Sequence, residues 1–206
     1  MVSTWTYRLA LATILLVAIG AESNAGDSQL SPFMVTRDKT SQPIGHYEFC
    51  RRYRDECAVK SPSEERVQLT GERWNELVAV NNEVNVSIKP ATDMEVYGRA
   101  EYWAYPVDRG DCEDYVLLKR RFLIGKGWPT GSLLITVVRQ RNGDGHAVLT
   151  VLTDRGDLVL DNREAHVLVW RETGYQYLKR QSEFDSGAWV AIEDGHPTAE
   201  VGSLSN

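Results

Sequence analysis

The sequence predicts an α+β domain in which helices come first along the chain and an antiparallel β-sheet follows. Two observations support this class. Apolar residues recur at helical spacing in two segments between positions 70 and 125, whereas strand-like runs separated by turn residues dominate positions 133–192. Helices followed by a series of strands are typical of α+β proteins, and we expect the sheet to pack on the second helix.

The composition is that of one globular domain with no general affinity for nucleic acid. The chain has 206 residues, of which 42% are hydrophobic and 25% are charged, so a disordered chain and a polytopic membrane protein are both disfavoured. Lys and Arg total 23 against 29 Asp and Glu, which gives a net charge of -6. This excess of negative charge favours a cation over nucleic acid as the ionic partner.

The N-terminus has the features of a signal peptide over residues 1–25. Arg8 precedes an apolar run over 9–19, and the small-residue pattern Ser23-Asn24-Ala25 follows it. An uncleaved membrane anchor is the less favoured alternative, because the run is much shorter than the ~20 residues that span a bilayer. We therefore expect an exported protein that does not stay in the membrane after cleavage, with residues 26–206 forming a single domain.

The first predicted helix begins after Thr70, which is a good N-cap residue. Its apolar positions extend over about four turns, and the Asn81-Asn82 pair weakens its far end. These positions are Trp74, Leu77, Val78 and Val84. Residues 26–62 show little pattern and predict an irregular lead-in, whereas residues 85–110 contain several Pro and Gly and predict a loop with at most a short turn.

The second predicted helix begins after Asp111, which can cap it, and Gly125 ends it. Acidic residues in the first turn and basic residues in the last turns match the helix dipole. They are Glu113 and Asp114 at the start, and Lys119, Arg120 and Arg121 towards the end. The following strands are expected over 133–138, 146–153, 158–161, 167–170 and 189–192.

Cys50 and Cys57 lie close together, and an exported protein usually pairs such cysteines. A continuous helix would separate their Cα atoms by about 10 Å, which is too far for a disulfide. A disulfide therefore predicts a break in any helix here, and two free or metal-binding thiols are the alternative. Pairing them leaves Cys112 as an intermolecular partner, an inert buried residue or a nucleophile.

Cys112 stands at the N-terminus of the second predicted helix, where unpaired backbone N–H groups point towards it. This position favours thiolate formation and supplies donors for a developing oxyanion, as a nucleophile requires. A buried packing role is the alternative, but the three flanking carboxylates would make a poor core. Cys112 is therefore the candidate nucleophile.

His146 and Asp161 are the candidate base and orienting carboxylate for this thiol. Of the four histidines, His146 is the best placed because it opens a predicted strand. Counting residues around the turn at Gly156 puts position 164 or 165 opposite His146, so Asp161 falls a few residues short unless a bulge or strong twist intervenes.

Several short runs resemble the bacterial transglutaminase-like cysteine proteinases. They are GDCEDY at 110–115, Lys119-Arg120, GHAVL at 145–149, DRGD at 154–157 and LDN at 160–162. The resemblance extends to Cys50 with Cys57, the helix over 74–85 and Trp103. It implies a papain-like or transglutaminase-like fold with Cys112 as nucleophile, His146 as general base and acid, and Asp161 as orienter. The 15-residue step from His146 to Asp161 agrees with the family's spacing.

The resemblance also implies a metal site and a biological setting. The best-known members are periplasmic, calcium-dependent proteases that cut a large surface adhesin and thereby control biofilm attachment, under an inner-membrane receptor for cyclic di-GMP. Their calcium ligands correspond to Asp111 and Glu113. Carboxylates beside Cys112 would oppose its ionisation, and a bound calcium ion would offset them. Asn142 and Asp144 are candidates to complete the shell, and helix capping is the alternative role for the acidic residues, above all for Asp114.

The leading hypothesis is therefore a periplasmic, calcium-dependent cysteine endopeptidase with the triad Cys112, His146 and Asp161. A transamidase of the transglutaminase type would use the same triad. From a different class, the chain could be a calcium-stabilised binding module with a vestigial thiol.

Trp103 is a candidate oxyanion donor or groove wall, with a core position as the alternative.

Overall fold

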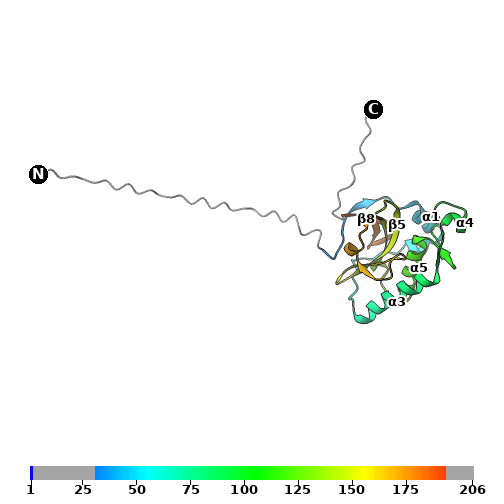
Figure 1. Ribbon diagram of the computed structural model, residues 1–206, viewed down its shortest axis with the longest axis horizontal. Helices are drawn as coiled ribbons and strands as arrows, with labels where there is room; N and C mark the ends of the chain where they lie inside the picture. Colours follow the sequence, from blue (N-terminus) through cyan, green and yellow to red (C-terminus); the bar gives the residue numbers. More distant parts are fainter. Residues whose placement is uncertain (2–30, 194–206) are drawn as a thin grey trace, which may run out of the picture.

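The computed structural model describes Met1 and residues 31–193, so the predicted signal peptide beyond its first residue lies outside the described part. The described residues form a seven-stranded sheet in the order β1-β9-β8-β4-β5-β6-β7, and all neighbouring strands are antiparallel (Figure 1). The strands are β1 (Val35–Thr40), β4 (Leu133–Arg139), β5 (Gly145–Thr153), β6 (Gly156–Leu160), β7 (Leu168–Val169), β8 (Gln176–Ser182) and β9 (Asp185–Glu193).

The helices precede most of the sheet in sequence, and α5 packs on both α3 and β5 (Figure 1). A short parallel ladder joins β2 (Lys89–Pro90) to β3 (Arg109–Gly110). The helices are α1 (Ile44–Arg52), α2 (Arg54–Cys57), α3 (Gly71–Ser87), α4 (Asp93–Tyr97), α5 (Cys112–Gly125) and the 3-10 turns η1 (Thr130–Ser132) and η2 (Trp170–Glu172). The predicted α+β class is confirmed.

Apolar residues cover both faces of the central strands. The larger cluster joins the inner faces of α3 and α5 to one face of the sheet, and includes Leu77, Val80, Val84, Leu117, Leu123, Leu149, Val151 and Leu160. The smaller cluster lies on the other face and includes Val138, Val148, Val159, Trp170 and Tyr177. Strand β5 is buried at every position after Gly145, which explains its nearly continuous apolar sequence.

The two predicted helices are confirmed, with corrections at their ends. Thr70 caps α3 by accepting the backbone N–H of Arg73 at 3.2 Å, and the helix continues through Asn81 to Ser87. Asn81 does not weaken it because its side chain bonds to another segment instead of competing for its own helix. The basic residues expected near the end of α5 are not in its last turn.

Elements with little apolar pattern were not predicted. Strand β1 lies in the expected irregular lead-in; its sequence VTRDKT is mostly exposed, and it pairs with β9 at the edge of the described sheet. Strand β8 buries Arg180 and Gln181 and so lacks apolar alternation. Helix α4 occupies the expected loop and begins with a capping box from Thr92 to Glu95.

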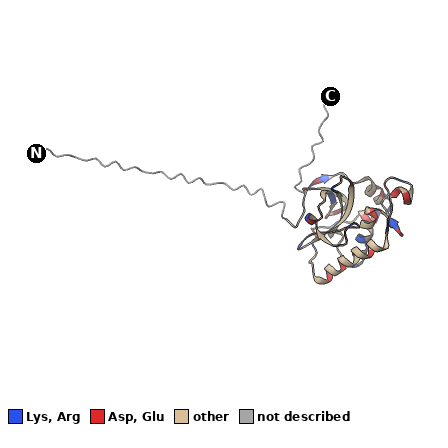
Figure 2. Ribbon diagram, viewed as in Figure 1, with Lys and Arg blue, Asp and Glu red and all other residues tan. Residues whose placement is uncertain are grey.

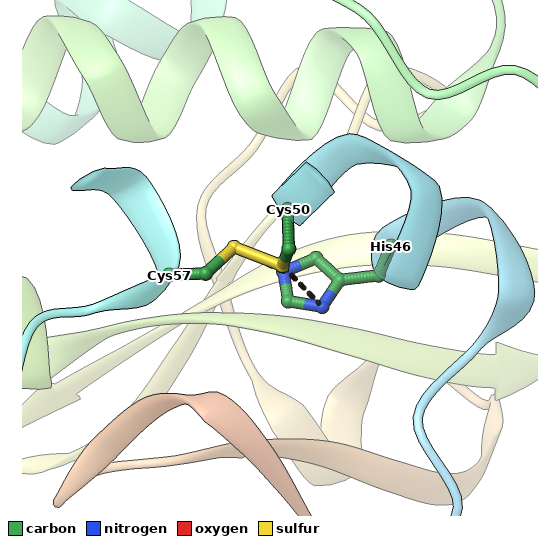
Figure 3. Close-up of side chains that lie close together, drawn as sticks. All are labelled: His46, Cys50 and Cys57. Atoms are coloured by element: carbon green, nitrogen blue, oxygen red, sulfur yellow. Dashed lines mark hydrogen bonds between the residues drawn. A yellow bond between two sulfur atoms is a disulfide. The ribbon is translucent and has the colours of Figure 1, made fainter. Parts of the chain in front are cut away.

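Cys50 and Cys57 form a disulfide, with their Cα atoms 5.6 Å apart. The helix is broken at Tyr53, which has φ -120° and ψ 67°, so α1 and α2 meet at an angle and bring the sulfurs together. Figure 3 shows the disulfide beside the ring of His46. Burial lowers the pKa of His46 to about 3, and Trp189 Nε1 donates to its Nδ1 at 3.1 Å. The alternative of free or metal-binding thiols at Cys50 and Cys57 is wrong for this structure.

Among the helices that the structure describes, none has the length and apolar character needed to cross a bilayer.

Candidate active site

Cys112 is the first residue of α5 and the free cysteine of the described chain. The chain enters this helix through Gly110, where a Cβ atom would overlap the side chain of Asp114, so a larger residue would displace the first turn. The thiol donates to Glu113 Oε2 at 3.1 Å. Burial first, and the neighbouring Glu113 carboxyl second, raise the pKa of Cys112.

His146 lies at the start of β5, and its Nε2 is 2.8 Å from Oδ1 of Asp161. The ladder between β5 and β6 runs without a bulge from Thr153 opposite Gly156 to Leu149 opposite Leu160. Continuing this register would put Asp161 opposite position 148, two residues from His146 on the same face. Side chains span such a diagonal, which accounts for the offset that the hairpin count left open.

Asp161 is buried and held on both carboxylate oxygens. Besides His146, the backbone N–H of Arg163 donates to Oδ1 at 3.0 Å, and the Tyr175 hydroxyl donates to Oδ2 at 2.6 Å. Burial raises the pKa of Asp161, but the hydrogen bonds led by His146 outweigh it, so its pKa is lowered. An ionised carboxylate only accepts, so His146 Nε2 carries a proton and neutral imidazole has Nδ1 free as a base.

Tyr175 is a site residue that the sequence analysis missed. Besides its hydrogen bond to Asp161, its ring packs edge-on against His146, with centroids 5.6 Å apart. It precedes β8 in a loop, and a single tyrosine in a loop gives no sequence signal for such a contact. Tyr175 therefore restrains the orientation of both partners of the His146–Asp161 pair.

Two hollows meet at Cys112 and His146, which line both of them. One has a volume of about 360 Å³ and is bordered by Ala91, Glu95 and Arg163 among others. The other has a volume of about 430 Å³ and lies against α1, Trp103 and Lys179. An extended peptide could therefore pass across the thiol with chain on either side of it.

Trp103 lines the second hollow and is also part of the apolar core, with 3% of its surface exposed. Its indole N–H donates to Glu101 Oε1 at 2.7 Å. The structure thus supports both the groove-wall and the core interpretation of Trp103. Because its indole N–H already donates to Glu101, it is not available as a donor to an oxyanion.

Asp93, Asp111 and Glu113 form a cluster whose carboxylate oxygens lie within 4.8 Å of one another. Acidic segments in α4 and at the start of α5 lie on one side of the molecule (Figure 2). Burial raises the pKa values of Asp111 and Glu113, and each is raised further by neighbouring carboxylates. Oδ1 of Asp93 and Oδ1 of Asp111 are buried without a hydrogen-bond partner among the described residues.

This donor set fits a hard divalent cation, because such ions prefer several carboxylate oxygens and would satisfy the unpartnered ones. Asp93 was not predicted. The capping box at Thr92 marks the start of α4 in the sequence, but its approach to Asp111 depends on the tertiary fold.

The structure does not bring Asn142 and Asp144 to this cluster, contrary to the prediction. Asn142 Nδ2 donates to Asp144 Oδ2 at 2.7 Å, and the backbone N–H of Asp144 donates back to Asn142 Oδ1 at 3.1 Å. Both lie in the exposed turn between β4 and β5, where Gly143 has a φ of +92°. Their amide and carboxylate shape this local turn.

Asp114 is also not a member of the cluster. It accepts the backbone N–H of Ala104 on Oδ1 at 2.8 Å, which ties the segment before β3 to the first turn of α5. Tyr115 is a packing residue; it is buried, and its hydroxyl donates to the backbone oxygen of Ile88.

The sequence over residues 36–197 matches the family described as bacterial transglutaminase-like cysteine proteinase. The chain belongs to this family. The protein is therefore a cysteine peptidase, which decides against the non-catalytic binding module. The matched region contains Cys112, His146 and Asp161. No curated protein matches the chain.

Solved structures of Legionella pneumophila LapG are similar to this peptidase. The calcium-bound LapG structure has 23% sequence identity and a TM-score of 0.50, and the match covers 79% of this chain and 88% of that chain. Another LapG structure has 28% identity and a TM-score of 0.48, covering 57% of this chain and 68% of that chain. The calcium-bound structure shows that the two proteins share a fold.

Proposed function

We propose that this cysteine peptidase is a calcium-dependent endopeptidase in which Cys112, His146 and Asp161 form the catalytic triad. The observation that supports it most is the hydrogen bond between His146 and Asp161 at the point where two hollows meet beside Cys112. Nucleophile, base and orienter thus come from one helix terminus, one strand start and one strand end.

In the proposed reaction, Nδ1 of His146 takes the thiol proton and Cys112 Sγ attacks the peptide carbonyl carbon. The backbone N–H groups at the start of α5 stabilise the negative charge that develops on the carbonyl oxygen. The protonated His146 then gives its proton to the leaving amine, which leaves a thioester on Cys112. His146 next deprotonates a water molecule, whose attack releases the acid and restores the thiol. Throughout, Asp161 holds the imidazole by Nε2.

The acidic cluster explains why a cation would be needed. The pKa of Cys112 is raised by burial and by Glu113, so the thiol is poorly ionised next to bare carboxylates. Asp93, Asp111 and Glu113 would hold calcium, which supplies positive charge there. A Glu113 carboxylate engaged with a cation is also a weaker acceptor for the thiol proton. The similarity to a calcium-bound structure of LapG supports the choice of ion.

We further propose, on the family resemblance and the predicted signal peptide, that the enzyme acts in the periplasm. Its substrate would be a large surface adhesin, and an inner-membrane receptor for cyclic di-GMP would regulate it.

Cleavage can be tested by incubating the purified enzyme with surface proteins of its source organism, with calcium or with a chelator, and mapping new protein termini by mass spectrometry. We expect calcium-dependent cleavage within an adhesin and none with Cys112→Ala. Cleavage that persists in Cys112→Ala would exclude the mechanism. Addition of a primary amine separates hydrolysis from transamidation, because only a transamidase would attach the amine to the new C-terminus.

The metal ligands can be tested by calorimetry with calcium. Asp93→Asn and Asp111→Asn should weaken calcium binding strongly, whereas Asp144→Asn, a matched change in the exposed turn, should leave it unchanged. Equal affinities in all three variants would rule out the cluster as the calcium site.

A further inference from the structure

The loop that follows β6 carries Asp161 and is held by side chains of α3. Asn81 Nδ2 donates to the backbone oxygens of Glu164 and Ala165 at 3.2 and 3.1 Å. One helical turn later, Asn85 Nδ2 donates to the backbone oxygen of Asp161 at 2.9 Å. Two amides on one face of α3 therefore hold the loop that carries Asp161.

The Asn81 side chain is itself fixed from α5. Lys119 Nζ donates to Asn81 Oδ1 at 2.8 Å, and both residues are 0% exposed. Lys119 follows Cys112 by seven residues, which is two helical turns, so both project from the same stripe of α5. The helix that presents the thiol and the loop that presents Asp161 are thus joined through two buried side chains.

Packing alone does not call for a lysine at this position. Burial lowers the pKa of Lys119 to about 7, while the negative charge of Asp161 raises it. Apolar side chains fill neighbouring inward positions of α5, as Leu117 and Leu123 do. Well-packed apolar residues often replace buried ionic groups without loss of stability, so burial by itself does not favour a lysine here. The contact to Asn81 therefore points to a role in the site.

We propose that Lys119 and Asn81 are positioning residues that fix the Asp161 loop relative to the helix carrying Cys112. The proposal rests on the proposed triad, because its consequence is that His146 stays aligned with the thiol. Displacement of the loop would misplace the base and would also move Arg163, which borders the first hollow. A misplacement of about 1 Å can lower the rate up to about 100-fold.

Three variants separate this role from general stability. Lys119→Met removes the donor and keeps the length of the side chain. Asn81→Asp keeps an acceptor for Lys119 but removes the amide donor to Glu164 and Ala165. The matched control is Arg120→Met, because Arg120 is also a buried cation on α5 but its bonds go to Leu133 and Glu56 instead of the loop.

The measurements are the thermal midpoint, the NMR signal of the His146 imidazole N–H bonded to Asp161, and kcat and KM on a peptide spanning the mapped cleavage site. We expect Lys119→Met and Asn81→Asp to shift or lose the imidazole signal and to lower kcat by about 10- to 100-fold, with a smaller change in KM. Arg120→Met should lower the midpoint but keep the signal and kcat.

The proposal is overturned if both variants keep the signal and kcat of the wild type, or lose them only as far as Arg120→Met does. If Lys119→Met does not fold, Asn81→Asp decides, because it preserves volume and the bond to Lys119. If the wild type cleaves no peptide while the imidazole signal changes only in these two variants, the positioning role stands and the proposed function fails.

Discussion

The two sides of the candidate active site differ in whether their buried carboxylate oxygens have hydrogen-bond partners. On the His146 side, both oxygens of Asp161 accept hydrogen bonds, from His146 and the Arg163 N–H on one and from Tyr175 on the other. The surrounding backbone is tied to α3 through Asn85. This half is complete within the described chain.

On the Cys112 side, three carboxylates each keep a buried oxygen without a hydrogen-bond partner among the described residues; they are Asp93, Asp111 and Asp114. Unsatisfied buried oxygens cost about 1–3 kcal/mol each, and more when charged. The described chain therefore satisfies the proposed base and its orienter by itself, whereas the proposed nucleophile lies beside carboxylates that a bound cation would offset.

The largest loss of activity is expected from a substitution of Asp161, which lies at the centre of the hydrogen bonds on the His146 side. Asp161→Asn would keep the shape of the side chain but remove the charge that fixes the Nε2–H form of His146. We expect kcat to fall by about 10⁴-fold, as loss of the orienting carboxylate does in comparable triads. Steady-state kinetics on the mapped peptide would measure it.

Asn162→Ala, at the next position, provides the control and should lose far less activity. If Asp161→Asn stayed within tenfold of the wild type, Asp161 would not be the orienting carboxylate.

The second effect is expected on the Cys112 side, in the reactivity of the thiol. Removing calcium with a chelator should slow alkylation of Cys112 by iodoacetamide by at least about tenfold, since each unit of increase in thiol pKa costs a factor of ten in thiolate. The labelled site is identified by mass spectrometry. Glu113→Gln should show a smaller response to the chelator because one opposing charge is gone. An alkylation rate that ignores calcium in the wild type would contradict a cation acting on the thiol.

The sequence predicted some residues of the two sides of the site and missed others. His146 and Asp161 could be paired because the family resemblance supplied the 15-residue step, but the hairpin count alone left an offset that only the diagonal contact explains. Cys112 could be placed because acidic residues and a glycine mark the start of α5. Local sequence pattern therefore identified residues that are placed by the helix or strand to which they belong.

Residues whose roles depend on distant contacts were missed or misassigned. Asp93 reaches Asp111 only through the tertiary fold, in which α4 and α5 both contact β3, and Tyr175 in a loop reaches Asp161. Asn142 and Asp144 are candidates for the metal shell by their place in the Gly-rich loop just before His146, but they bond to each other in a turn. Lys119 was expected to serve the helix dipole, whereas the tertiary fold buries it against Asn81.

A third, smaller effect is expected at Tyr175. Tyr175→Phe would keep the ring against His146 but leave Oδ2 of Asp161 without its donor. Stability should fall by about 1–3 kcal/mol and kcat by no more than about tenfold, because Oδ1 still holds the imidazole. Urea unfolding and kinetics would measure both, with Tyr177→Phe as the control for a buried tyrosine on the same side of the sheet. A loss as large as that of Asp161→Asn would mean that Tyr175 itself takes part in the chemistry.

The smallest effect is expected in the pH dependence of calcium binding. Because burial and mutual repulsion raise the pKa values of Asp111 and Glu113, part of the cluster is protonated near neutral pH. Calcium binding must displace these protons, so calcium affinity should rise as pH rises towards 8, and titration in buffers of different ionisation enthalpy should show proton release. Asp161 has a lowered pKa and should contribute no protons in this range. Proton release that is absent at pH 7, or equal in Glu113→Gln, would show that the carboxylates next to Cys112 are already ionised without the cation.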